Sequence, residues 1–421
     1  MPPEKKQPTS LGKVSNLDKA NKTKKLLFIT WDGPQTSYME GLFMPIFHAI
    51  HQKDHSLEFH ILQFTWAGKE KTNQVAQKAA ELGIHYRALP ILKKPVASLG
   101  SLATLFTSSG KIKKYIQENQ IDIVMPRATF PAFMINQIQK DFKGKIIFDA
   151  DGLPIEERVD FAGLQKGSRQ YRWMKSIETQ MLKNADAVIT RSQKAINIHI
   201  ENIGEKYRSK FSVVFNGRNK EKFSLHPEYR KEARAQLSLT DDEFLFVYAG
   251  SLGPQYCMNE MLEIFKQQSE HQESRFLILT GNTTFAEENI PKELSSKIII
   301  KSVPSDEVPF YLNAADCAFA LRQPSHSMQG VAPIKLGEYL LCGLPVIASK
   351  GIGDTDEILS HFEECYLYDH QIPLATQLPD ILRFTQNTAH ADQNAISEKA
   401  RRYFSLEAAA TTYLHALEKL K

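Results

Sequence analysis

The stretch from Gly330 to Ser349, GVAPIKLGEYLLCGLPVIAS, contains residues whose types and spacing could bind an anion and a polar ligand. Lys335 and Glu338 are three positions apart, so a helix would place their amine and carboxylate on one face. Pro333 suits the first turn of such a helix, and Gly343 suits a left-handed cap about ten residues later. A surface helix with one salt bridge is the alternative interpretation.

The start of this helix is the expected anion site. Unpaired backbone N–H groups and the positive end of the helix dipole attract phosphate at such a position. The residues expected to line the approach are Gly330, Val331, Ala332 and Pro333. The segment then continues into a short apolar strand, which predicts a loop, a helix and a buried strand in that order.

The whole string resembles the nucleotide-binding signature of family 4 retaining glycosyltransferases, which have the GT-B fold. The matching positions are Pro333, Lys335, Leu336, Glu338, Tyr339, Gly343, Pro345 and Val346. In that family, a glutamate at the position of Glu338 holds the ribose hydroxyls of a nucleotide-sugar donor. Many members have a second glutamate where this chain has Gly330, so the chain resembles the subgroup with a P-x-K-x-x-E-Y motif. Loop backbone or Lys335 is then expected to take over part of the sugar contact.

Length and composition indicate a soluble protein of two domains. The chain has 421 residues, of which 42% are hydrophobic and 24% are charged. The net charge of +4 comes from the first 25 residues, which hold seven lysines and two carboxylates. We expect residues 1–23 to form a disordered basic leader, with attraction to anionic lipid headgroups as its functional alternative. Without an apolar export or membrane segment, we expect a cytoplasmic protein, at most peripheral at the inner face of the membrane.

Two sets of short apolar runs alternate with longer amphipathic stretches, which predicts two parallel sheets covered by helices. The first set spans 26–30, 58–64, 121–125, 145–149, 186–190 and 211–215, and the second spans 244–249, 275–280, 297–301, 317–321 and 344–348. We expect an N-terminal acceptor-side domain at 24–216 and a C-terminal nucleotide-sugar domain at 217–402. In the resembled family, the final helix, here 403–421, packs back on the first domain.

Several predicted strand ends of the second half carry candidate donor contacts. Gly250 and Ser251 follow a strand directly, where small residues admit a diphosphate close to the backbone, and a plain strand-to-helix turn is the alternative. Arg322 ends another predicted strand, where it either contacts a phosphate or forms a surface ion pair. Arg218 follows an Asn-Gly turn and is either a phosphate ligand or a solvated hinge residue.

In the first half, the candidates face the acceptor or the donor sugar. Gly33 ends the first strand and allows close approach of a ligand, while Ser37 either faces the cleft or caps a helix. Asp151 and Glu157 are candidate acceptor or sugar contacts, with helix capping by Asp151 as the alternative. Arg127 either approaches the bound ligand in the same region or forms a structural ion pair with one of these carboxylates.

These features together predict transfer of a sugar from a nucleotide diphosphate sugar to a glycan, lipid-linked or other hydroxyl acceptor, with retention at the anomeric carbon. We expect no cofactor, no catalytic metal, no nucleic acid partner and no covalent nucleophile, and the family's usual setting is polysaccharide assembly. Three rivals remain open. They are a metal-dependent transferase using Asp149 and Asp151, a nucleotide-sugar epimerase of the same GT-B architecture, and a noncatalytic sugar-nucleotide binding protein.

Overall fold

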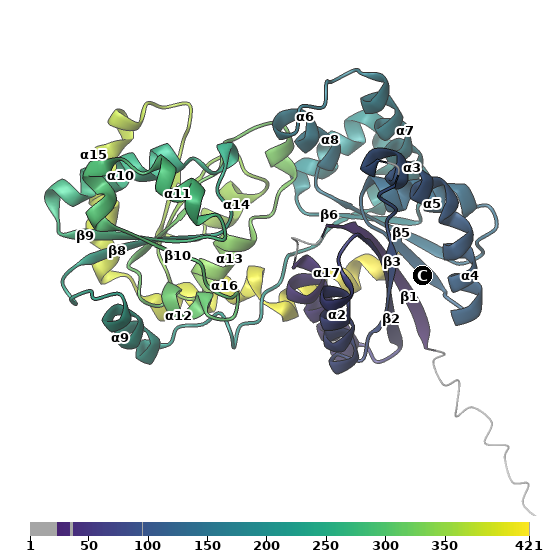
Figure 1. Ribbon diagram of the computed structural model, residues 1–421, viewed down its shortest axis with the longest axis horizontal. Coiled ribbons are helices and arrows are strands. Elements are labelled where there is room, and N and C mark those ends of the chain that lie inside the picture. The colour runs from purple at the N-terminus through teal and green to yellow at the C-terminus, as the bar shows by residue number, and fades with distance from the viewer. Residues whose placement is uncertain (1–22, 34–36, 95, 421) are drawn as a thin grey trace, which may run out of the picture.

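The computed structural model describes residues 23–33, 37–94 and 96–420, and it forms two lobes (Figure 1). Each lobe is built on one sheet whose paired strands are parallel, and a hydrophobic core lies on each face of that sheet. This architecture confirms the predicted α/β class with two Rossmann-like sheets. The leader predicted at residues 1–23 lies almost entirely outside the described residues.

The first sheet has seven strands in the order β3-β2-β1-β4-β5-β6-β7. In chain order these are β1 (Lys24–Asp32), β2 (Leu57–Thr65), β3 (His85–Pro90), β4 (Ile123–Pro126), β5 (Lys145–Asp151), β6 (Ala187–Thr190) and β7 (Phe211–Val213). The helices of this half are α1 (Met44–Lys53), α2 (Lys69–Glu81), α3 (Ala97–Thr107), α4 (Ser109–Asn119), α5 (Thr129–Ile138), α6 (Pro154–Phe161), α7 (Arg169–Asn184) and α8 (Gln193–Ile203).

The second sheet has six strands in the order β10-β9-β8-β11-β12-β13. They are β8 (Phe244–Ala249), β9 (Ser274–Leu279), β10 (Ile298–Lys301), β11 (Cys317–Ala320), β12 (Val346–Ser349) and β13 (Cys365–Tyr368). Around them are α9 (Pro227–Gln236), α10 (Met258–His271), α11 (Thr283–Asn289), α12 (Val308–Leu312), α13 (Ile334–Leu341), α14 (Thr355–Leu359), α15 (Leu374–Asn387) and α16 (Gln393–Phe404).

Strand order reverses direction once in each sheet, between β1 and β4 in the first and between β8 and β11 in the second. Ligands of open parallel sheets bind in the crevice outside the carboxyl ends of the strands at such a reversal. Gly33, Arg127 and Gly250 directly follow β1, β4 and β8, and Arg322 lies two positions after β11. The topology therefore brings four predicted site residues to the two places where a ligand site is expected.

The last helix, α17 (Leu406–Glu418), returns to the first lobe, where Figure 1 shows it in yellow among the purple elements. It packs on α1, and its buried Ala409, Ala410 and Tyr413 join the core formed with Leu26 and Phe28 of β1. The chain thus crosses between the lobes twice, once after β7 and once after α16.

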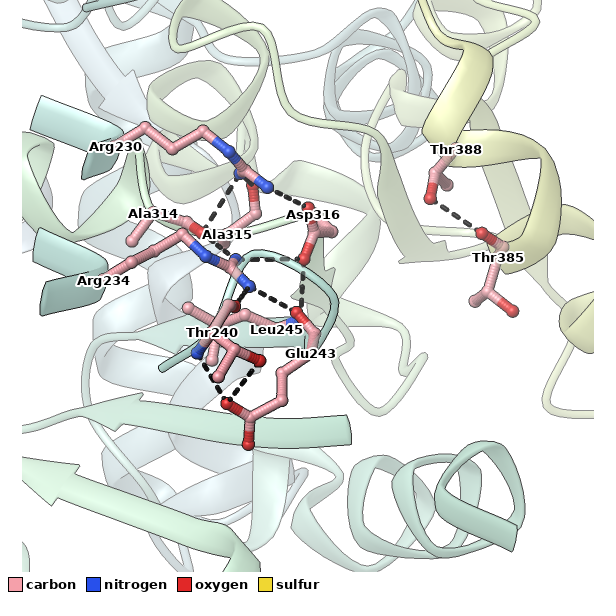
Figure 2. A network of polar contacts seen from close by, with 10 residues as sticks. All are labelled: Arg230, Arg234, Thr240, Glu243, Leu245, Ala314, Ala315, Asp316, Thr385 and Thr388. Carbon is pink, nitrogen blue, oxygen red and sulfur yellow. Dashed lines mark hydrogen bonds and ion pairs between the residues drawn. The ribbon is translucent and has the colours of Figure 1, made fainter. Parts of the chain in front are cut away.

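A buried arginine ties together the amino-terminal ends of β8 and β11 in the second sheet (Figure 2). Arg234 of α9 is 2% exposed and donates to the carbonyls of Thr240, Glu243 and Ala314. Asp316 accepts from Arg230 at 2.7 Å and from the backbone N–H of Leu245 at 2.7 Å. This network fixes the starts of β8 and β11, because Arg230, Arg234 and Asp316 bond to backbone and side chains at both strands.

The helix predicted within 330–349 forms as α13, one position later than expected. Pro333 precedes it with extended backbone angles, so it is the N-cap residue and not the first helical residue. Gly343 has φ +74°, which confirms the predicted left-handed cap. The N–H of Val331 donates to Met328 O at 3.2 Å, so the expectation that it is unpaired is wrong.

Candidate functional site

A cavity of about 550 Å³ lies between the lobes at the carboxyl ends of both sheets. It brings together twelve of the predicted site residues: Gly33, Arg127, Asp151, Glu157, Gly250, Ser251, Arg322, Gly330, Val331, Ala332, Pro333 and Lys335. Ser37, Arg218 and Glu338 are not among its lining residues. A site between domains, with polar groups converging from both walls, is the usual form of a small-molecule site.

Lys335 is the central cation on the second-lobe wall. Its Nζ donates to the Tyr248 hydroxyl at 2.7 Å and lies 4.4 Å from the ring centroids of Tyr248 and Tyr256. Burial, followed by the nearby Arg322 charge, lowers the pKa of Lys335 to about 7. An anion bound beside this amine would favour its protonated form, because opposite charge at close range stabilises the ammonium.

Gly250 lets Lys335 lie across the loop that follows β8. It has φ +144°, and a Cβ built on it would lie 2.0 Å from Lys335 Cε and 2.1 Å from Nζ. A side chain at this position would therefore displace the lysine as well as strain the backbone. The glycine expected to admit a diphosphate is thus also the residue that lets the cation reach the loop.

Glu338 and Arg218, which the sequence suggested separately, form one ion pair. An Nη of Arg218 donates to Glu338 Oε1, and its other Nη donates to the carbonyl of Gly41 in the first lobe at 2.6 Å. The guanidinium also lies 5.1 Å from the Phe223 ring centroid. About 11% of the Glu338 side chain stays exposed. Arg218 therefore orients this carboxylate and links it to the opposite lobe.

The first-lobe wall holds two aspartates and two arginines. Arg127 contacts Asp151 at 2.6 Å, and Arg191 contacts the fully buried Asp149 at 2.9 Å. Cross-contacts of 3.6 Å between Arg191 and Asp151 and 3.8 Å between Arg127 and Asp149 complete the cluster. Although burial opposes ionisation, the charges of Arg127 and Arg191 lower the pKa of Asp151.

This cluster does not fit a divalent ion. Each aspartate is already neutralised by an arginine, so a metal would have to displace or lie beside two positive charges. Asp151 does not cap α6, which has Leu153 as its N-cap residue with no side-chain cap. A bulge between Asp149 and Asp151 and a φ of +63° at Asp151 instead aim its carboxylate at Arg127.

The remaining predicted residues differ in their positions. Glu157 lines the cavity, where desolvation, followed by the Asp151 charge, raises its pKa. Ser37 is exposed, and the helix that follows it begins as a π-helical turn at Met39 with no side-chain cap. The predicted capping role of Ser37 is therefore wrong.

Gly330 lies where the two lobes touch directly. A Cβ on Gly330 would lie 2.7 Å from the Leu153 nitrogen, and one on Gly152 would lie 2.2 Å from the Gly330 carbonyl oxygen. Beside it, Ser192 Oγ donates to Gln329 O at 2.6 Å and Ser327 N donates to Asp160 Oδ2 at 2.9 Å. The position that carries a glutamate in many members of the resembled family has no room here for a side chain.

Sequence reasoning missed several residues of the cavity, chiefly Arg191 and the aromatic Trp31, Tyr38 and Tyr256. Arg191 could have been found because it directly follows the buried strand β6, as Arg127 follows β4. Tyr256 gave no such signal, since its position over Lys335 and Arg322 depends on the folding of the loop after β8.

The fold and the site together define a GT-B protein. Residues 229–402 match the family model described as "Glycosyl transferases group 1". No curated protein matches the sequence.

Solved structures with the same architecture cover nearly the whole chain. HepE of Anabaena, in complex with UDP and glucose, has a TM-score of 0.68 at 18% identity, over 94% of this chain and 99% of that one. Sucrose-phosphate synthase of Thermosynechococcus elongatus has a TM-score of 0.68 at 16% identity, over 94% and 99%. WaaG, a glycosyltransferase involved in lipopolysaccharide biosynthesis, has a TM-score of 0.65 at 15% identity, over 93% and 98%.

Proposed function

We propose that this protein is a glycosyltransferase of family 4 that transfers a sugar from a nucleotide diphosphate sugar to a hydroxyl acceptor, with retention at the anomeric carbon. The observation that carries the proposal is Lys335, a cation held across Gly250 where strand order reverses in the second sheet. The match of residues 229–402 to a glycosyltransferase model and the UDP bound by HepE support the same donor class.

The donor lies along the second-lobe wall in this proposal. Its diphosphate contacts the Gly250–Ser251 loop, Lys335, Arg322 and the start of α13, where backbone N–H groups and the helix dipole favour negative charge. Its ribose hydroxyls bind Glu338, which Arg218 holds in place. We assign residues 217–402 to this donor side and residues 24–216 to the acceptor side. The last helix was expected to begin at residue 403, but α16 continues to Phe404 in the second lobe, so only α17 joins the acceptor side.

Departure of the nucleoside diphosphate develops negative charge on the leaving oxygen. Lys335, Arg322 and the N-terminus of α13 are already oriented, so they stabilise this charge more strongly than the ground state. The acceptor hydroxyl attacks from the same face as the leaving group, and its proton passes to the departing phosphate oxygen. This front-side displacement needs no covalent nucleophile and no metal, so we expect turnover without added Mg²⁺ or Mn²⁺.

The first-lobe wall receives the acceptor in this proposal. Asp151 and Glu157 offer carboxylate oxygens to its hydroxyls, while Arg127 and Arg191 keep Asp151 ionised. Gly33 leaves space between the two ligands at the carboxyl end of β1. The donor sugar then lies between the walls, near the direct contact of the lobes at Gly330.

The acceptor side also has an apolar surface suited to a lipid layer. The helix α3 has no charged residue, and Val96, Leu99, Leu102 and Phe106 are between 42% and 57% exposed along it. Exposed Lys93, Lys94, Lys111 and Lys114 flank these side chains. Apolar groups beside lysines fit a membrane surface with anionic headgroups, so we propose peripheral contact there. In the described residues, no helix is long and apolar enough to span a membrane.

Vesicle co-sedimentation tests this surface. The double variant Leu99→Ser with Leu102→Ser should lose binding to anionic vesicles, and Ile372→Ser, which changes an exposed apolar residue of the second lobe, should retain it. Equal binding by both variants would remove α3 from the proposal.

A thermal-shift screen of nucleotide diphosphate sugars tests the donor assignment. A ligand that binds only the folded state raises its melting temperature, so the true donor should stand out in the panel. Stabilisation by no member of the panel would overturn the proposal. Donor breakdown to a new sugar nucleotide without acceptor would favour an epimerase, and binding without turnover would favour a noncatalytic sensor.

A further inference from the structure

A second cluster of potential ligands lies in the first sheet, toward the amino-terminal ends of β2 and β3 and away from the cavity between the lobes. Glu58 and His60 are two positions apart on β2, so their side chains share one face of the strand. His85 begins the edge strand β3 and pairs with His60 in the sheet register. About 16 Å of strand separates His60 from the carboxyl end of β2, so this cluster is independent of the donor site.

The three side chains converge on one carboxylate oxygen. Glu58 Oε1 lies 2.8 Å from His60 Nε2 and 3.3 Å from His85 Nε2, and all three ligand atoms lie within 4.8 Å of one another. A tetrahedral zinc ion with bonds of about 2.0–2.1 Å separates neighbouring ligand atoms by about 3.3 Å. The Glu58 and His85 atoms already have this spacing, and the Glu58 and His60 atoms need to part by about half an ångström.

The second ring nitrogen of His60 has a hydrogen-bond partner, as that of a metal-binding histidine usually does. His60 is 2% exposed, and its Nδ1 lies 3.0 Å from the hydroxyl of Tyr115 on α4. A hydrogen bond at one ring nitrogen orients the other nitrogen and fixes its tautomer, as second-shell partners do in zinc sites. Without an ion, Nε2–H donates to Glu58; with an ion bound, the proton moves to Nδ1, which donates to the Tyr115 hydroxyl, and the Nε2 lone pair binds the ion.

We propose that Glu58, His60 and His85 bind one Zn²⁺ ion, with water as the fourth ligand. Two imidazoles and one carboxylate are a set that zinc accepts, whereas Mg²⁺ and Ca²⁺ prefer oxygen ligands alone.

Two local adjustments accompany binding. The His85 ring stacks on His60 with centroids 4.5 Å apart, and it tilts so that both lone pairs meet the ion. Its side chain is 60% exposed, which leaves it free to do so. Lys25 Nζ, 3.8 Å from Glu58 Oε1, moves toward solvent as the ion takes its place.

The ion would join the edge strand β3 to β2. Among the residues that the structure describes, β3 pairs with β2 and with no other strand. A ligand that binds only the folded state raises the free energy of unfolding by mass action. Here the added stability would act on β3, which has a strand partner on one side only among the described residues.

Isothermal titration of Zn²⁺ into the full chain without a polyhistidine tag tests the site. We expect one equivalent to bind, and His85→Ala should raise the Kd at least about a hundredfold, since loss of even a second-shell partner costs about 10- to 100-fold. Tyr115→Phe should raise it about tenfold by releasing His60. His415→Ala is the matched control, because it removes an exposed histidine that pairs with Glu418 at 3.6 Å.

Cobalt substitution reports the coordination of the ion directly, and circular dichroism shows whether each variant is folded. Co²⁺ in the wild-type chain should give the visible absorption bands of a four-coordinate ion, and these bands should be absent in Glu58→Gln and present in His415→Ala. Zinc binding that His85→Ala and Glu58→Gln leave unchanged, or no binding by the wild type, would overturn the proposal.

Discussion

Replacing Gly250 by alanine tests whether Lys335 is the diphosphate contact. The new Cβ would lie 2.0 Å from Lys335 Cε, so the lysine must leave its position over the loop. Its hydrogen bond to Tyr248 would break, and its ammonium would no longer face the site of the diphosphate. The fold itself should tolerate the change with a cost of about 1–3 kcal/mol for the φ of +144°.

The expected loss of affinity follows from the contact removed. A hydrogen bond to a charged group contributes about 1.5–3 kcal/mol, which corresponds to a rise in Kd of about 13- to 160-fold. Calorimetry with the nucleoside diphosphate and with the nucleoside separates the two parts of the ligand. The diphosphate should lose this affinity in Gly250→Ala, and the nucleoside should bind almost as in the wild type.

Gly281→Ala is the matched control for this experiment. Gly281 lies two positions after the neighbouring strand β9, and a Cβ there would meet no atom within 4 Å. Its diphosphate affinity should equal that of the wild type. In a Lys335→Ala background, Gly250→Ala should have little further effect on the diphosphate, because the side chain it displaces is gone. Wild-type diphosphate affinity in Gly250→Ala, or an equal loss for the nucleoside, would refute the reasoning.

Three further predictions concern the ion pairs and the lowered pKa. Below pH 7 Lys335 is already protonated, so the Kd for the donor should change little with pH. Above pH 7 donor binding takes up a proton, and the Kd of the wild type should rise by up to about tenfold per pH unit. The Kd of Lys335→Ala should not show this rise. Glu338→Gln should weaken nucleoside and nucleoside diphosphate equally in calorimetry, about 10-fold or more, because it alters ribose contacts; loss confined to the diphosphate would contradict this. Arg191→Ala should lower the free energy of unfolding by about 3–5 kcal/mol, since Asp149 is left buried without its closest partner, and denaturant unfolding should show no comparable loss in Arg208→Ala, which removes an exposed pair with Glu205.

The central strands of both sheets were predictable because they are continuous apolar runs. The strand at 244–249 was predicted at its observed bounds, and ten others lie within two residues of theirs. The missed strands, β3 with HYRALP and β13 with CYLY, are edge strands that pair on one side only. Both are partly exposed, and their sequences lack the apolar run on which the prediction depended. The edge strands β7 and β10 were predicted because their sequences keep such a run.

At the candidate site, the sequence identified individual residues but did not show which of them contact one another. Glycines and charged residues after buried strands were found because parallel strands end at one edge, which brought Gly33, Gly250 and Arg322 to one cavity. The pairing of Arg218 with Glu338 could not be predicted, since it joins residues 120 positions apart through the path of the interdomain segment. The closed contact at Gly330 likewise depends on how the two lobes meet.

Acceptor-dependent transfer is the most direct test of the account. The purified chain, given the donor identified by thermal shift and a glycan or lipid-linked acceptor, should release nucleoside diphosphate only when the acceptor is present. Proton NMR of the product should show the anomeric configuration of the donor, and Lys335→Ala should release far less. Product of inverted configuration would contradict the proposed displacement, and release by Lys335→Ala at the wild-type rate would contradict the assignment of the cavity.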